Sequence, residues 1–168
     1  LGRGRTGSGK TLAFALPLVQ RLAEEDMARA GHPIGLVLAP TRELVLQIAE
    51  TIRPLADALE LSVTTIFGGV SQKPQEKALA GGVDIVVACP GRLLDLMGQG
   101  IVVLDDVSVT VLDEADHMAD LGFLPGVRRI MRATPARGQR LLFSATLDNG
   151  VDRIVEEFLH DPLHHAVD

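Results

Sequence analysis

Short apolar runs rich in β-branched residues alternate along the chain with longer segments whose apolar residues recur every three or four positions. The first pattern is typical of strands buried on both faces, and the second of amphipathic helices. In the clearest helical segment, Leu44, Ile48 and Ile52 repeat at a spacing of four. Strands are expected at residues 35–39, 62–67, 84–88, 107–112, 140–143 and 163–167. Helices are expected from near residue 10 and at residues 41–58, 72–80, 92–97, 127–133 and 150–159.

This alternation predicts one α/β domain over residues 1–168, with three layers: a mostly parallel central sheet and helices on both faces. Neither an internal repeat nor a linker interrupts the pattern. In such sheets, ligands bind beyond the carboxyl ends of the strands. Residues that directly follow strands are therefore the candidates for function. They include Thr41, Gly68, Arg92, Asp113 and Ser144.

The composition bears on function mainly through charge. The formal net charge is −6, and the chain has only three lysines. A protein that binds nucleic acid mainly through charge is usually basic, so such contacts are expected to use backbone N–H groups, helix N-termini and a few arginines. The single cysteine, Cys89, can form no disulfide within the chain, and no membrane-spanning run or signal peptide is apparent. We therefore expect a cytoplasmic domain without membrane association.

Residues 4–11, Gly-Arg-Thr-Gly-Ser-Gly-Lys-Thr, match the phosphate-loop pattern G-x-x-x-x-G-K-[S/T] at every position. Glycines let a loop turn its N–H groups toward phosphate oxygens, and the helix that follows directs its positive end there. Lys10 is expected to reach the β- and γ-phosphates, and the Thr11 hydroxyl to hold Mg²⁺. A chance glycine-rich turn is the plainer alternative, which eight matching positions before an apolar helix argue against. The expected phosphate-binding residues are Thr6, Gly7, Ser8, Gly9, Lys10 and Thr11.

An apolar run at residues 109–112 leads directly into Asp113 and Glu114. Asp113 is expected to hold Mg²⁺ through water, because Mg²⁺ keeps most of its hydration shell. Glu114 can orient or deprotonate an attacking water. A solvated acidic turn is the plainer interpretation, and the phosphate loop upstream argues against it.

Residues 113–116 spell Asp-Glu-Ala-Asp, and the chain thereby resembles the DEAD-box family of ATP-dependent RNA helicases, most of all the bacterial RhlE-like branch. The other family motifs occur in family order over essentially the whole chain: Thr-Gly-Ser-Gly-Lys-Thr at residues 6–11, Pro-Thr-Arg-Glu-Leu at 40–44, Gly-Gly at 68–69, Pro-Gly-Arg at 90–92 and Ser-Ala-Thr at 144–146. The resemblance implies the first of two RecA-like domains, which binds ATP and Mg²⁺ at its sheet edge and RNA across the top.

The resemblance also implies roles for individual residues. Lys10, Asp113 and Glu114 would serve catalysis. Ser144 and Thr146 would link the nucleotide site to unwinding through hydrogen bonds near Asp116, and the strand before Ser144 would lie between the phosphate-loop strand and the strand before Asp113. The RNA sugar-phosphate backbone would be contacted without sequence preference by Pro40, Thr41, Arg42, Gly68, Gly69, Pro90, Gly91 and Arg92.

Some residues depart from the family pattern or have plainer interpretations. Cys89 stands where the family usually has Thr, and a thiol is a weak hydrogen-bond partner for RNA or a helix end. Gly4 stands where the family usually has Ala, which keeps the loop small. Taken alone, Thr41 is an ordinary helix N-cap and Gly68-Gly69 an ordinary turn. The histidines at 160, 164 and 165 are interpreted as surface residues rather than metal ligands.

The family also has an adenine-selecting glutamine segment and a second RecA-like domain with arginine fingers, and neither is found in this sequence. We therefore expect the isolated domain to be a monomer with negligible ATPase activity, whose partners are RNA and the second domain. The alternatives are a DEAD-type translocase on DNA, an ATP-gated RNA clamp or scaffold, and a general phosphate-loop kinase or transport ATPase, against which the DEAD and Ser-Ala-Thr motifs argue.

Overall fold

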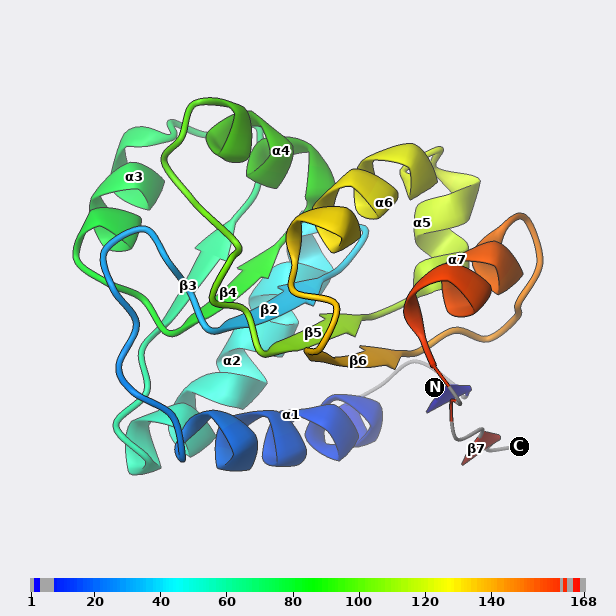
Figure 1. The fold of residues 1–168 in the computed structure, drawn as a ribbon, viewed down its shortest axis with the longest axis horizontal. Helices are drawn as coiled ribbons and strands as arrows, with labels where there is room; N and C mark the ends of the chain where they lie inside the picture. Colours follow the sequence, from blue (N-terminus) through cyan, green and yellow to red (C-terminus); the bar gives the residue numbers. More distant parts are fainter. Residues whose placement is uncertain (1, 4–7, 161, 163–164, 167–168) are drawn as a thin grey trace.

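The computed structural model describes residues 2–3, 8–160, 162 and 165–166, and its centre is a five-stranded sheet (Figure 1). Every neighbouring pair of strands in this sheet is parallel. The predicted α/β fold with a parallel sheet is therefore confirmed. In spatial order the strands are β3 (Val63–Ile66), β4 (Ile85–Ala88), β2 (Gly35–Leu38), β5 (Val109–Leu112) and β6 (Gln139–Leu142).

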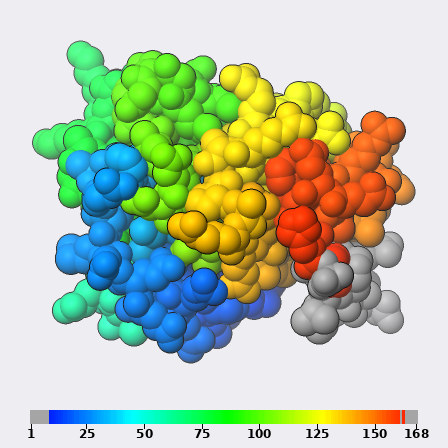
Figure 2. All heavy atoms as spheres, viewed as in Figure 1, coloured from blue at the N-terminus to red at the C-terminus, as the bar shows by residue number. Residues whose placement is uncertain are grey.

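Helices cover both faces of the sheet, as the alternating pattern predicts. Two long helices, α1 (Ser8–Leu22) and α2 (Arg42–Ala58), lie side by side below the sheet in Figure 1. In the space-filling view, α6 and α7 pack against each other, in yellow-orange and red (Figure 2). The helices of the second face are α3 (Lys73–Ala80), α4 (Pro90–Gly98), α5 (Ala115–Asp120), α6 (Leu124–Ala133) and α7 (Val151–Phe158).

The strands separate two apolar cores because successive side chains point to opposite faces. In β2, Leu36 and Leu38 join the core beneath α4 and α6, whereas Val37 joins the core of α1 and α2. All three side chains are fully buried, and such burial contributes about 1.5–3 kcal/mol for each residue. This two-sided burial explains why the central strands appear in the sequence as continuous apolar runs.

The element boundaries differ from the predicted ones by a few residues. The helix predicted at 92–97 begins at Pro90, because proline suits the first helical turn, where its missing N–H has no partner to lose. The helix predicted at 127–133 begins at Leu124. The helix α5, Ala115–Asp120, was not predicted. It directly follows Glu114, so the acidic motif lies at the junction between a strand and a helix.

One topological expectation needs correction. The strand before Ser144, β6, does pair with β5, as predicted. However, β1 (Gly2–Arg3), which precedes the phosphate loop, pairs with β7 (His165–Ala166) in a separate two-stranded sheet, and within the described residues it makes no ladder with β6. Two residues can supply only a short ladder, and here that ladder is made with β7.

Candidate nucleotide and nucleic-acid site

The candidate residues gather at the carboxyl edge of the sheet because all five strands run in the same direction. Pro40 follows β2, Gly68 follows β3, and Pro90 follows β4. Asp113 follows β5, and Ser144 follows β6. This edge is where α/β sheets bind ligands, and residues far apart in the sequence meet there.

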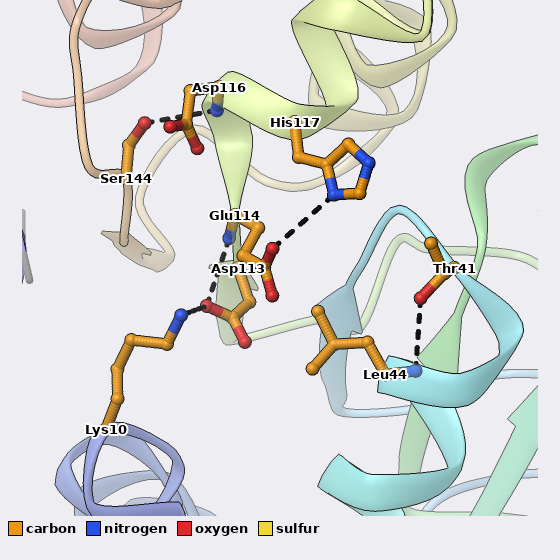
Figure 3. A network of polar contacts seen from close by, with 8 residues as sticks. All are labelled: Lys10, Thr41, Leu44, Asp113, Glu114, Asp116, His117 and Ser144. Atoms are coloured by element: carbon orange, nitrogen blue, oxygen red, sulfur yellow. Dashed lines mark hydrogen bonds and ion pairs between the residues drawn. The ribbon is translucent and has the colours of Figure 1, made fainter. Parts of the chain in front are cut away.

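Lys10 and Asp113 form an ion pair at this edge (Figure 3). The Lys10 Nζ lies 2.9 Å from the Asp113 Oδ1, and the two side chains are 12% and 0% exposed. Oδ1 also accepts a hydrogen bond from the Glu114 N–H at 3.0 Å. The other oxygen, Oδ2, is buried and has no hydrogen-bond partner among the residues that the structure describes.

Burial raises the pKa of the Asp113 carboxyl above its usual range, and Lys10 opposes that rise through a hydrogen bond and its charge. A buried carboxylate with a free oxygen has a strong electrostatic requirement for a cation or a polar donor. Thr11 is also buried and lines the same cleft as Asp113. A hydroxyl and a carboxylate are hard oxygen ligands, so this pair fits Mg²⁺, which takes few protein ligands and keeps its waters.

Glu114 has an unusual backbone conformation, with φ 51° and ψ 54° in the left-handed region. This conformation costs a non-glycine residue about 1–3 kcal/mol and is often found at functional sites. It ends β5 and starts α5, so the Glu114 side chain leaves the chain beside Asp113 (Figure 3). The Glu114 Oε1 lies 3.4 Å from the His117 Nδ1.

A cleft of about 510 Å³ opens beside the ion pair. Lys10, Thr11, Asp113 and Glu114 line one side of it, and the first turns of α2 line the other. A smaller hollow of about 130 Å³ also contains Lys10 and Glu114 and extends to Ser144. Lys10 and Glu114 therefore lie between two adjoining hollows.

Ser144 connects β6 to the acidic motif. Its Oγ accepts a hydrogen bond from the Asp116 N–H at 3.1 Å and donates one to the Thr146 carbonyl oxygen. The predicted hydrogen bond between this segment and Asp116 is thus confirmed. Because the Asp116 N–H is at the start of α5, a movement of residues 144–146 would break or shift this hydrogen bond to the acidic motif.

The phosphate loop is described only in part. Thr6 and Gly7 lie outside the described residues, and α1 begins at Ser8. Gly9 is exposed in the first turn of that helix. A helix N-terminus offers unpaired N–H groups to an anion, and the first turn of α1 lies next to the cleft that Lys10 and Thr11 line.

The segment predicted to begin the RNA surface starts α2. Thr41 is the N-cap, and its hydroxyl oxygen accepts a hydrogen bond from the Leu44 N–H at 3.2 Å, as its plainer interpretation predicts (Figure 3). Pro40 is buried. Arg42 is exposed, and its guanidinium lies 4.9 Å from the ring centroid of Phe67.

The predicted glycines face open space. A Cβ added to Gly68, Gly69 or Gly91 would meet no atom within 4 Å. Position 69 requires glycine because its φ of +78° lies in a region that other residues rarely adopt. At Gly68 and Gly91, however, protein packing does not require the small residue, so their surfaces are free for close approach by a ligand.

Pro90 is buried in the first turn of α4, and Arg92, which follows Gly91, is half-buried. Arg92 donates from Nη2 to the Val70 carbonyl oxygen at 2.8 Å and from Nη1 to the Gln75 Oε1 at 3.3 Å. Gln75 was not predicted as a site residue. The sequence carries only a weak signal for it: Gln75 lies four residues before Leu79, so helical spacing places both on the buried face of α3.

Cys89 caps α4 without a side-chain hydrogen bond, so the expected weakness of a thiol at this helix end is confirmed. Burial, and next the charge of Glu43, raise the pKa of this thiol to about 11. Within the described part of the chain, no cluster of three or more His, Cys, Asp or Glu is arranged to hold a metal. None of the helices that the structure describes is both long and apolar enough to cross a membrane.

A parallel α/β sheet with a phosphate-loop helix and an acidic pair at its carboxyl edge defines a RecA-like nucleotide-binding domain. Comparison with known proteins extends this result. The sequence profile of the family described as DEAD/DEAH box helicase matches residues 1–154. The chain therefore belongs to the DEAD/DEAH box helicase family.

Individual relatives cover nearly the whole chain. ATP-dependent RNA helicase DBP2 of Encephalitozoon cuniculi is 44% identical over 168 residues, which are 99% of this chain and 34% of that protein. ATP-dependent RNA helicase RhlB of Pseudomonas syringae pv. tomato is 46% identical over 168 residues, 96% of this chain and 42% of that protein. The yeast DEAD-box splicing factor Prp28 superposes with a TM-score of 0.92 at 33% identity, covering 99% of this chain and 40% of that one. The chain thus spans less than half the length of these relatives, and the RhlE-like branch stays a prediction.

Proposed function

We propose that this chain is the ATP-binding domain of an ATP-dependent RNA helicase and that it provides one side of the RNA-binding surface. The observation that carries this proposal is the Lys10–Asp113 ion pair, with a free, buried Asp113 Oδ2 and Glu114 adjacent to it. A purely structural ion pair gains nothing from an unsatisfied buried oxygen in a residue that lines a cleft, whereas a site for a phosphate-bound cation uses such an oxygen.

ATP hydrolysis assigns a separate task to each of these residues. The Lys10 ammonium would leave Asp113 for the β- and γ-phosphate oxygens, and Thr11 and Asp113 would hold Mg²⁺. Bound Mg²⁺ would supply positive charge against the phosphate oxygens. Glu114 would orient a water toward the γ-phosphorus and accept its proton as the new P–O bond forms. The bond to the β-phosphate oxygen breaks, and ADP leaves with that electron pair.

The RNA side of the proposal rests on open backbone rather than on charge. Gly68, Gly69 and Gly91 leave their surfaces uncovered, and Arg42 is exposed at the start of α2, over the Phe67 ring. Backbone and arginine contacts of this type hold sugar and phosphate without reading bases. Ser144 is hydrogen-bonded to both Asp116 and Thr146, and through these bonds it would couple the nucleotide site to RNA unwinding.

The test uses the full-length parent protein and the variant Glu114→Gln, with Glu156→Gln as the control, because Glu156 is an exposed glutamate on α7. We expect RNA to stimulate ATP hydrolysis, and Glu114→Gln to reduce the rate by at least about 100-fold, the lower range for losing a general base. Glu156→Gln should leave the rate unchanged. A Glu114→Gln rate within a few-fold of wild type would contradict the role of this carboxylate.

Two further measurements separate the alternatives. Stimulation by DNA rather than RNA would identify a DNA translocase. Cellular function that survives Glu114→Gln would favour an ATP-gated clamp or scaffold. The 168-residue chain alone is expected to turn over ATP negligibly, and strong RNA-stimulated hydrolysis by it would contradict this expectation.

A further inference from the structure

Gln75 lies in the interior behind the predicted RNA-binding segments. It belongs to α3, and the residue is 7% exposed. Its Nε2 donates to the Phe67 carbonyl oxygen at 3.0 Å, and its Oε1 accepts from the Arg92 Nη1 at 3.3 Å. Both ends of the amide are therefore satisfied, which a buried amide requires.

These bonds connect the two ends of the glycine segment. Phe67 immediately precedes Gly68-Gly69, and Val70 immediately follows them. Gln75 holds the Phe67 carbonyl directly, and Arg92 holds the Val70 carbonyl at 2.8 Å while it is itself bound to Gln75. One buried amide thus holds the Phe67 carbonyl directly and the Val70 carbonyl through the Arg92 guanidinium, and these two carbonyls flank the glycine pair.

The same bridge reaches the other predicted RNA segments. Arg92 follows Pro90-Gly91 at the start of α4, so its guanidinium ties that turn to the glycine pair. The Phe67 ring, which is 9% exposed, lies beneath the Arg42 guanidinium at 4.9 Å. Three segments that come from distant parts of the sequence therefore depend on a common set of contacts.

Fixing this loop has a clear physical purpose. Two consecutive glycines have more backbone freedom than other residues, and an unrestrained pair would have to lose that freedom when it binds. The glycine N–H groups can hold phosphate oxygens in a fixed geometry only if the flanking carbonyls are held. Burial of Gln75 and the engagement of Arg92 provide that restraint before any ligand arrives.

We infer that Gln75 is a positioning residue for RNA: it holds residues 67–70 and the Arg92 side chain in the geometry that accepts the sugar-phosphate backbone. This inference rests on the proposed function and deepens it. Gln75 touches neither ATP nor RNA in this scheme, and it acts through Phe67 and Arg92.

The experiment compares Gln75→Leu, Gln75→Glu and Gln99→Ala in the full-length parent protein. Gln99 is a matched control because it also joins the ends of α3 and α4: it is the C-cap of α4, and its side-chain amide bonds that of Gln72, the N-cap of α3, at 2.9 Å. The measurements are the concentration of a single-stranded RNA that gives half-maximal ATPase stimulation, the KM for ATP, and the melting temperature.

We expect Gln75→Leu to raise the half-saturating RNA concentration by at least about fivefold, the effect of losing one or two hydrogen bonds, while the KM for ATP stays within about twofold, because the ATP-site residues are untouched. Gln75→Glu keeps an acceptor for Arg92 but replaces the donor to Phe67 with an oxygen that repels the carbonyl, so it should also raise the half-saturating RNA concentration. Gln99→Ala should match wild type.

The outcomes are distinguishable. If Gln75→Leu needs no more RNA than wild type, or if its RNA requirement and its KM for ATP rise equally, the positioning role is wrong. If Gln75→Leu does not fold, the same two readouts on Gln75→Glu decide. If the wild-type ATPase does not respond to RNA at all, the proposed function itself is wrong.

Discussion

Replacing Lys10 with Met would leave the Asp113 carboxylate buried without the cation that lies 2.9 Å from its Oδ1. Methionine keeps most of the apolar stem of lysine, so the change removes the charge and little of the packing. Breaking a buried ion pair from one side costs about 3–5 kcal/mol, because the remaining charge is desolvated and unpaired. Lys10 retains 12% exposure, so we expect the lower end, about 3 kcal/mol at pH 7.

Proton uptake sets a ceiling on this cost. A carboxyl with the ordinary pKa of 3.8 can be protonated at pH 7 for about 4 kcal/mol, and beyond that cost the folded variant would simply take up a proton. Because burial already raises this pKa in the folded wild type, the ceiling on the further loss in the variant is lower than this value.

The sign of the pH dependence follows from the direction of the shift. Burial raises the pKa of folded Asp113 above its unfolded value, and Lys10 opposes that rise. Removing Lys10 therefore raises the folded pKa further, and the variant binds its proton more tightly than the unfolded chain does. Its stability relative to wild type falls as pH rises above the folded pKa of the wild type, and is regained as pH falls below it.

Urea unfolding followed by circular dichroism measures this effect, since the chain has no Trp or Tyr for intrinsic fluorescence. Lys77→Met, at an exposed lysine on α3, is the control and should change the free energy of unfolding by less than about 0.5 kcal/mol. The Lys10→Met cost should shrink to under about 1 kcal/mol near pH 4. A cost that is equal at pH 7 and pH 4, or below about 1 kcal/mol at pH 7, would refute the reasoning.

Two other expectations concern groups outside the nucleotide cleft, a half-buried thiol and a buried carboxylate. Since burial raises the pKa of the Cys89 thiol from 9.0 to about 11, alkylation by iodoacetamide at pH 8 should be about 100-fold slower than for an unperturbed thiol; labelling as fast as that of free cysteine would contradict this. Asp84→Asn should lower the free energy of unfolding by about 2 kcal/mol, because the buried carboxylate accepts bonds from the Ala28 N–H and from the Ser62 N–H and hydroxyl. The urea midpoint measures this loss, Asp57→Asn at an exposed site on α2 is the control, and an unchanged midpoint would show that these bonds contribute little.

The central strands were predictable because their environment is uniform. β2, β4 and β5 are buried at every position, so continuous apolar runs identify them. Helix α5 was missed for a local reason: it has six residues and starts after Glu114 in a left-handed conformation, without a side-chain cap. No standard helix-start signal exists at such a junction. A tertiary contact fixes the strand-to-helix turn instead: the Ala115 N–H donates a hydrogen bond to the Phe143 carbonyl oxygen at 3.0 Å.

The candidate site was predictable to the level of residue type and strand end. Parallel strands bring Asp113 and Ser144 to one edge, the first turn of α1 places Lys10 there, and their motifs gave the order along the chain. Side-chain partners were not predictable in the same way. Arg92 has several donors and many possible acceptors, and only the packed structure shows that it binds the Val70 carbonyl and Gln75. Its contact with RNA stays a prediction.

The partners of the cations bear on how an acidic domain would hold the RNA proposed as its partner. With a formal net charge of −6, it cannot attract RNA through a general positive field. Its relevant cations already have internal partners: Lys10 is paired with Asp113, Arg92 holds backbone carbonyls, and Arg42 lies over Phe67. These contacts fix each cation in place, and a phosphate that displaces one must replace its bonds. The RNA binding proposed above would therefore depend on geometry at the carboxyl edge, and a buried residue such as Gln75 would then matter as much as the cations themselves.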